Sequence, residues 1–318
     1  MGAEWVDFVA TSPAGGDLEV RWIHGSPIAR RNTDAPIQIH AYNSHTFILR
    51  QNKAVHYEAP FVYLFCGNDR ALLLDTGATA DPVLFPLRDT VEGIVRDWLT
   101  EHPRDNYELV VAHTHAHGDH IAGDPQLDGR PNTTVVAPDL ASVREYFGIT
   151  DWPEEIVTFD LGGRVLDIFG VPGHHDASIA IYDRWTGFLL TGDTVYPGRL
   201  YVKDFTAFAA SIARLIAFAE SHPVSHVMGC HIEMTRAPGR DYPITTTYQP
   251  NEPALQMTLE QLKAVGAATA TATRPGVHRF DDFVIFNGPC KGAVLRQLAR
   301  ARWGRLRDRL TSPRRPTP

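Results

Sequence analysis

The densest group of side chains able to bind a metal lies in residues 110–124, which read VVAHTHAHGDHIAGD. An apolar, strand-like run leads directly into His113 and, after it, into three more histidines and one aspartate before residue 121. Imidazoles and carboxylates packed so closely carry a high desolvation cost unless a positive ion binds them. Imidazole nitrogen and carboxylate oxygen are ligands of Zn²⁺ and of related dications. The stretch therefore predicts a metal centre.

The spacing within this stretch predicts two neighbouring metal positions. His115 and His117 are separated by one residue, so both side chains can point into one cavity beyond the end of the strand. A turn at Gly118 then allows Asp119 and His120 to reach a second position nearby. His113 precedes this pattern, and a packing or supporting role is as compatible with its position as a role in the centre.

Residues 115–120, HAHGDH, match the HxHxDH signature of the metallo-β-lactamase superfamily, and the resemblance continues in the family's order. The supporting elements are LLDTG at residues 73–77, VPGH at 171–174, LTGD at 190–193 and GCH at 229–231. The chain departs from the family at Cys230, where glycine more often precedes the last histidine. The resemblance covers roughly residues 61–231, and five elements at compatible spacing are far more specific than any one of them.

The resemblance implies seven metal ligands, arranged as two groups that share one carboxylate. They are His115, His117 and His174 for the first metal, Asp119, His120 and His231 for the second, and Asp193 between the two. This donor set implies two Zn²⁺ ions per chain, although Fe²⁺ and Mn²⁺ accept the same donors.

Three neighbouring residues receive supporting roles. In relatives Asp75 most often anchors the ligand loop and is not itself a ligand. The Pro-Gly-His element selects His174, which leaves His175 as a pocket or supporting group. Cys230 is expected to pack, because Asp119 already fills the position that a thiolate ligand would take.

The activity implied is hydrolysis, with a hydroxide that bridges the two metals attacking the carbonyl of a lactone, thioester or ester. Asp119 would also orient this nucleophile or carry its proton. Tyr196 lies three residues after Asp193, the spacing at which similar lactonases place a hydroxyl near the attacked carbonyl. A true β-lactamase lacks the carboxylate at the position of Asp193, so the residue favours the branch that includes glyoxalase II-like thioesterases and lactonases.

Two other activities of the superfamily remain open. A persulfide dioxygenase-like oxidoreductase binds one iron on two histidines and one aspartate of a similar set. A phosphodiesterase or ribonuclease-type hydrolase would act on phosphate esters. The net charge of −7 argues against a nucleic-acid partner, because a phosphate-reading surface needs an excess of Lys and Arg. We therefore expect a small-molecule substrate, and the sequence leaves the oligomeric state open.

The resemblance implies an α/β fold, the αββα sandwich with two mixed β-sheets between outer helices. The pattern of apolar runs predicts strands at residues 18–23, 45–50, 61–66, 71–75, 109–112, 156–159, 164–169, 178–182, 187–190, 224–228 and 277–286. Helical spacing predicts helices at residues 86–101, 138–147, 205–221, 253–265 and 292–310. We expect an N-terminal extension over residues 1–35, a single domain over 36–310 and a disordered tail over 311–318.

Composition and cysteine usage bear on the compartment. The chain has three widely spaced cysteines, which form neither a disulfide framework nor a zinc-ribbon pattern. The N-terminal residues lack the basic start and apolar run of a signal peptide. Apolar stretches are far shorter than the roughly 20 residues of a membrane span. We expect a cytoplasmic protein with no membrane partner.

Overall fold

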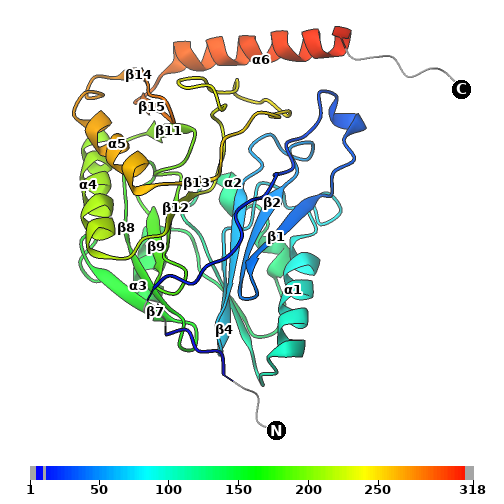
Figure 1. Cartoon of the computed structure of the whole chain (residues 1–318), viewed down its shortest axis with the longest axis vertical. Coiled ribbons are helices and arrows are strands. Elements are labelled where there is room, and N and C mark those ends of the chain that lie inside the picture. The colour runs from blue at the N-terminus through cyan, green and yellow to red at the C-terminus, as the bar shows by residue number, and fades with distance from the viewer. Residues whose placement is uncertain (1–4, 10–11, 312–318) are drawn as a thin grey trace, which may run out of the picture.

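Two six-stranded sheets lie face to face in the computed structural model, which describes residues 5–9 and 12–311 (Figure 1). The first sheet has the order β1-β2-β3-β4-β5-β6. Its strands are β1 (Ile37–Asn43), β2 (Thr46–Gln51), β3 (Phe61–Cys66), β4 (Arg70–Leu74), β5 (Glu108–Ala112) and β6 (Thr133–Val135). The sheet is mixed, because β1 to β4 pair antiparallel whereas β4, β5 and β6 pair parallel.

The second sheet has the order β13-β12-β10-β9-β8-β7 and is also mixed, because β10 and β12 are parallel and its other pairs are antiparallel. Its strands are β7 (Ile156–Asp160), β8 (Val165–Gly170), β9 (Ile179–Asp183), β10 (Phe188–Gly192), β12 (His226–Gly229) and β13 (Gln256–Met257). A smaller sheet contains β11 (Arg199–Val202), β15 (Val284–Asn287) and β14 (Gly276–Arg279), in that order.

Helices cover the outer faces of both large sheets, which is the predicted αββα arrangement (Figure 1). The helix α1 (Leu87–Glu101) packs on the first sheet, and α4 (Phe205–Ser221) and α5 (Leu259–Thr269) pack on the second. The remaining helices are α2 (Gly118–Ile121), α3 (Leu140–Phe147), α6 (Lys291–Thr311) and two 3₁₀ turns, Ala29–Arg31 and Asp124–Leu127. None of the described helices is long and apolar enough to cross a membrane.

The interior between the sheets is built from strands that are apolar on both faces. In β3 the side chains of Tyr63 and Phe65 belong to the cluster between the sheets, while Val62 and Leu64 pack towards α1. All four are fully buried. Each such side chain contributes roughly 1.5–3 kcal/mol to stability through burial. A strand that is buried on both faces therefore stabilises the neighbouring strands and the positions of the loops that follow them.

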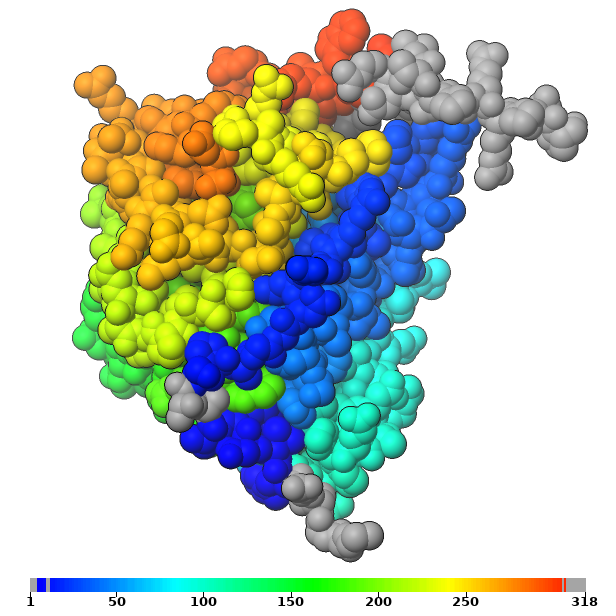
Figure 2. Space-filling model, viewed as in Figure 1, coloured from blue at the N-terminus to red at the C-terminus, as the bar shows by residue number. Residues whose placement is uncertain are grey.

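The chain before β1 crosses from one sheet to the other. The backbone N–H of Ala14 donates to the carbonyl of Trp185, beside the second sheet, and that of Asp17 donates to the carbonyl of Tyr42 in β1. Trp22 is buried in the cluster between the sheets. Figure 2 shows this segment, in dark blue, running across the face where the two halves of the molecule meet.

Three predicted elements differ in the structure. Residues 18–23 form no strand, because their backbone makes no regular hydrogen-bond ladder with either sheet. Side chains such as Trp22 hold this segment in place. The helix expected from residue 253 begins at Leu259, where Thr258 and Gln261 form a capping box. The strand expected over residues 277–286 is a hairpin of β14 and β15. The expected tail lies outside the described residues, except Thr311, which ends α6.

Candidate metal centre

The predicted ligands all follow strands whose ends meet at one edge of the sandwich. Residues 113–120 follow β5, and in the second sheet His174, Asp193 and His231 follow β8, β10 and β12. These last three strands run in the same direction, because β9 is antiparallel to both β8 and β10 while β12 is parallel to β10. Side chains from distant parts of the chain therefore meet in one place.

The first group brings three imidazoles together. The Nε2 atom of His115 lies 2.9 Å from Nδ1 of His117 and 3.2 Å from Nε2 of His174. Nε2 of His174 is also 2.9 Å from Nδ1 of His117. Burial and the neighbouring imidazoles hold the pKa of His115 well below its usual value. Burial also lowers the pKa of His117 and of His174, so the three imidazoles favour the neutral form, in which ring nitrogens can accept a cation.

The second group combines two imidazoles with two carboxylates. Nε2 of His231 lies 3.3 Å from Asp119 Oδ2 and 3.4 Å from Asp193 Oδ1. Nε2 of His120 lies 3.6 Å from the Oδ2 atoms of both Asp119 and Asp193. Burial opposes charge at His231, but Asp193 and Asp119 outweigh it and raise its pKa to about 9.

The carboxylate of Asp193 lies between the two groups. Its Oδ2 atom is 3.6 Å from Nε2 of His120 in the second group and 3.7 Å from Nε2 of His174 in the first. Asp193 is nearly buried. The carboxylate of Asp193 is thus close enough to contact an ion in either group of donors.

Within the described part of the chain, two buried atoms at this point lack a hydrogen-bond partner, namely Nε2 of His120 and Oδ1 of Asp193. Such orphaned atoms are costly unless something binds them. With a metal–nitrogen distance of about 2.0–2.1 Å, neighbouring ligands of a tetrahedral dication lie roughly 3.3 Å apart, which agrees with the spacing of these donors. The residues therefore fit metal ions at both positions.

The opposite ring nitrogens of three of these histidines are held by other groups, which fixes the atoms that face the centre. Nδ1 of His174 donates to the carbonyl of Tyr201 at 2.7 Å, and Nδ1 of His231 lies 3.3 Å from the carbonyl of Glu58. Nδ1 of His120 donates to Asp75 at 2.8 Å.

Asp75 is an anchor shared by several loops. It adopts a left-handed backbone conformation, with φ of 68°, directly after β4. Its carboxylate accepts the backbone N–H of Thr114 at 2.7 Å and lies 3.2 Å from Sγ of Cys230. Cys230 is fully buried, and burial with the charge of Asp75 raises the pKa of its thiol well above the usual value. This arrangement agrees with the supporting role expected for Asp75 and with packing for Cys230.

Tyr196 lies differently from expectation. Its hydroxyl donates to the carbonyl oxygen of Arg199 and lies 3.1 Å from Oε2 of Glu233. The residue is 1% exposed, and its ring packs edge-on against His231, with centroids 5.6 Å apart. The hydroxyl is thus committed to two oxygen atoms of the protein, whereas an attacked carbonyl would need it free.

Two other histidines lie at the margin of the centre. His113 is buried and its Nε2 atom lies 2.9 Å from Oδ1 of Asp124, away from the two groups of ligands. His175 packs its ring against those of His115 and His117, with centroids 5.9 Å and 5.2 Å apart. Neither belongs to the groups of donor atoms that can share one ion.

Sequence reasoning missed the residues that buttress the centre from other parts of the chain. Arg199 is fully enclosed and forms ion pairs with Glu233 and Asp241. Its Nε donates to the hydroxyl of Tyr201, whose backbone carbonyl orients His174. These residues carry no recognisable motif. Only the burial of so many charges in one place identifies the network.

Comparison with known proteins agrees with this geometry. The sequence profile of the metallo-beta-lactamase superfamily matches residues 58–226. The hydroxyacylglutathione hydrolase of Methylococcus capsulatus is 30% identical over 204 residues, which cover 61% of this chain and 72% of that protein. The hydroxyacylglutathione hydrolase of Rhizobium meliloti is 24% identical over 234 residues, covering 69% and 82%.

A solved structure supports the fold. The metallo-beta-lactamase FIM-1 from Pseudomonas aeruginosa superposes with a TM-score of 0.51 and 16% identity, covering 77% of this chain and 99% of that one. At this identity the likeness concerns the fold alone. Because the family profile spans more than half of the chain, the protein belongs to the metallo-β-lactamase superfamily. The family and the named relatives confirm the predicted class, a metal-dependent hydrolase.

Proposed function

We propose that the protein hydrolyses a carbonyl ester bond, with a thioester as the first candidate and a lactone as the second, at a centre of two metal ions. The position of Asp193 between the two groups of donors is the observation that carries the proposal. A carboxylate shared by the two positions would offset part of the charge of two neighbouring dications. The naming of the relatives as hydroxyacylglutathione hydrolases supports the thioester.

In this proposal His115, His117 and His174 would hold the first ion and Asp119, His120 and His231 the second, with Asp193 in reach of both groups of donors. Zn²⁺ suits these donors, as do Fe²⁺ and Mn²⁺. Metal ions bound here supply Lewis acidity and activate water for attack on a carbonyl carbon.

The chain's own residues then have separate tasks. Asp119 is partly exposed, and hydrogen bonding from His231 with the charge of His120 keeps its pKa well below the usual value despite burial. We assign it the orientation of the attacking water and the transfer of its proton to the leaving group. Tyr196 is assigned a positioning role, because its ring supports His231 and its hydroxyl is bound to Arg199.

The charges near the centre favour a carbonyl substrate over a phosphodiester. The segment between β2 and β3 approaches the ligands, since the carbonyl of Glu58 contacts His231. Burial lowers the pKa of His56 in this segment, and the charge of Asp119 acts in the opposite direction. Two buried cations lie nearby: Arg199 is already paired with Glu233 and Asp241, and Lys53 donates to the carbonyl of Tyr57. A phosphodiester needs cations to offset its own charge and that of the transition state.

A substrate panel tests this proposal with zinc-loaded and manganese-loaded protein. It contains a hydroxyacyl glutathione thioester, a simple acyl thioester, a γ-lactone, a β-lactam and an activated phosphodiester. We expect the highest kcat/KM on a thioester, followed by the lactone. A phosphodiester turned over at a higher kcat/KM than either would overturn the assignment to carbonyl chemistry.

A further inference from the structure

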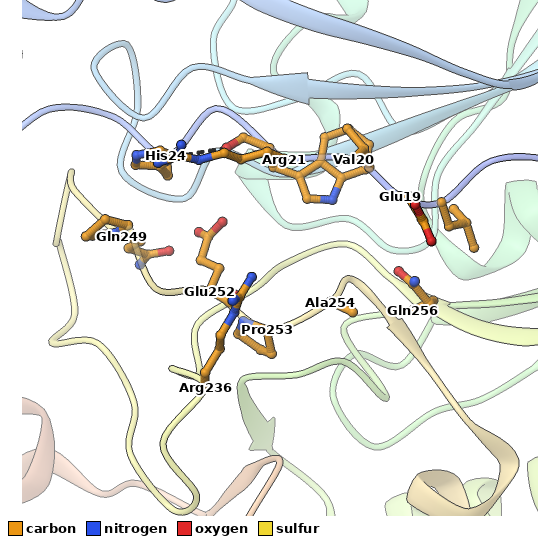
Figure 3. Close-up of a pocket in the computed structure, with 13 residues that line it drawn as sticks. Glu19, Val20, Arg21, His24, Arg236, Gln249, Glu252, Pro253, Ala254 and Gln256 are labelled. Atoms are coloured by element: carbon orange, nitrogen blue, oxygen red, sulfur yellow. Dashed lines mark hydrogen bonds between the residues drawn. The ribbon is translucent and has the colours of Figure 1, made fainter.

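A second cleft lies away from the metal centre, between the N-terminal segment and the chain after His231. It has a volume of about 600 Å³, within the range of small-molecule sites. Residues 18–22 and His24 form one wall, and Arg236 with parts of residues 249–256 forms the other (Figure 3). None of the seven proposed metal ligands lines it.

The lining of the cleft includes a buried amide oxygen that has no partner among the described residues. Gln249 is 4% exposed, and its Oε1 atom is buried with no hydrogen bond from any residue that the structure describes. Its backbone is fixed, because its N–H donates to the carbonyl of His24 at 2.8 Å. A buried amide oxygen without a donor costs about 1–3 kcal/mol. The orphaned atom therefore points to a ligand that supplies an N–H or O–H.

The rim of the cleft is rich in donors. Arg236 uses its Nε atom to bind the carbonyl of Glu252 at 3.0 Å, and among the described residues its two terminal nitrogens have no hydrogen bond or ion pair. The guanidinium of Arg21, on the opposite wall, likewise has none among the described residues. A guanidinium presents a planar fork of N–H groups that matches a carboxylate.

The acidic groups of the cleft do not cancel these cations. Glu252 is bound through both oxygens by the buried guanidinium of Arg50, at 2.5 and 2.6 Å. Glu19, an exposed residue, is the remaining carboxylate of the lining. Arg21 and Arg236, which form no ion pair with any described residue, thus leave an excess of positive charge beside a neutral amide.

We propose that this cleft binds a small carboxylate with a neighbouring N–H donor, of the class of N-acyl amino acids. The carboxylate pairs with Arg236 and Arg21, and the N–H donates to Oε1 of Gln249. The N-terminal segment then serves as one wall of a ligand site. This assignment is independent of the substrate proposed for the metal centre.

The test is isothermal titration of the zinc-loaded protein with N-acetylglycine. Carboxylates also bind metals, so variants distinguish the two places. Gln249→Met removes the amide at similar length, and Arg236→Gln removes one cation of the rim. Arg96→Gln makes the same charge change on the exposed face of α1 and serves as the control.

We expect one equivalent bound per chain in the cleft, with affinity at least tenfold lower in Gln249→Met and several-fold lower in Arg236→Gln. Arg96→Gln is expected to match the unaltered protein, and all three variants to keep their hydrolase rate. Equal affinity in all variants would place the ligand elsewhere and overturn the proposal. If Gln249→Met fails to fold, the comparison of Arg236→Gln with Arg96→Gln still decides.

Two further probes test the chemical class. N-acetylglycinamide keeps the N–H but lacks the charge, and inorganic phosphate keeps the charge but lacks the amide. Both are expected to bind at least tenfold more weakly than N-acetylglycine. Equal or tighter binding of either one would contradict the assignment to an amide-bearing carboxylate.

Discussion

Asp193 is the residue on which the two-metal hypothesis depends, because its carboxylate reaches nitrogens of both groups. Replacing it with asparagine preserves the size and removes the charge. We expect Asp193→Asn to retain fewer than two metals per chain and to lose hydrolysis by orders of magnitude, with an unchanged far-UV circular dichroism spectrum. Elemental analysis of the zinc-loaded proteins measures the first effect.

The unaltered protein is expected to reach a plateau near two metals per chain in the same analysis. A plateau at one metal would contradict the shared carboxylate. In the protein as purified, before zinc is added, one iron per chain without zinc would favour the oxygenase-like alternative. If Asp193→Asn kept both metals and nearly full activity, the assigned role of this residue would be wrong.

A substitution of Tyr196 distinguishes a catalytic role of its hydroxyl from a positioning role. Its hydroxyl is buried against Arg199 and Glu233, so we expect Tyr196→Phe to lower the free energy of unfolding by about 1–2 kcal/mol. We expect kcat on the best substrate to stay within a few-fold. Chemical denaturation and steady-state kinetics measure the two effects. A fall of kcat by orders of magnitude at unchanged stability would show that the hydroxyl takes part in catalysis.

At the scale of elements, the position of His174 in the loop after β8 depends on the glycine that precedes it, Gly173. Gly173 has φ of 136°, and a Cβ at this position would lie 2.5 Å from the backbone nitrogen and Cα of Phe208, at the start of α4. The loop therefore packs directly on the N-terminal turn of a helix whose cap, Asp204, accepts the N–H of Ala207. Only glycine permits both the conformation and the approach.

Gly173→Ala is expected to lower the free energy of unfolding by more than about 1 kcal/mol and to weaken metal binding in the first group, because His174 moves with the loop. Gly93→Ala is the matched control, since this glycine lies within α1 and a Cβ there meets only the end of Arg96 at 3.9 Å. The control should gain up to about 1 kcal/mol. Equal effects of the two changes in denaturation and metal titration would contradict this account.

For the whole molecule, we propose that residues 36–310 form one domain, as expected from the sequence. The support is the single interior cluster to which both large sheets contribute. The metal centre joins loops of both sheets at the edge of this interior. Metal binding should therefore stabilise the entire domain and not one half of it.

Removal of metal is expected to lower the melting temperature by on the order of 10 °C, because ions at concentrations far above their Kd contribute several kcal/mol and each kcal/mol corresponds to a few degrees or less. Calorimetry of zinc-loaded and chelator-treated protein measures the shift. A single transition in both samples agrees with one domain. Separate transitions, with only one of them sensitive to metal, would contradict it.

The amino-acid sequence determined the elements whose pattern is local. The predicted bounds of strand β3 and helix α4 are those of the structure, because a continuous apolar run and a helical periodicity are patterns of neighbouring residues. The structure also brings His115, His117, Asp119 and His120 together after one strand, as their spacing predicts, and their role as metal ligands stays a prediction. For these features the sequence pattern and the structure agree.

The tertiary structure alone decided features that depend on distant partners. Strand β11 has four residues and pairs with β15, more than 80 residues later, so no local pattern predicts it. The direction of the Tyr196 hydroxyl was decided by the Arg199 carbonyl and by Glu233, which reaches it from another loop. Burial makes each of these contacts strong, and the folded chain alone determines which groups are buried together.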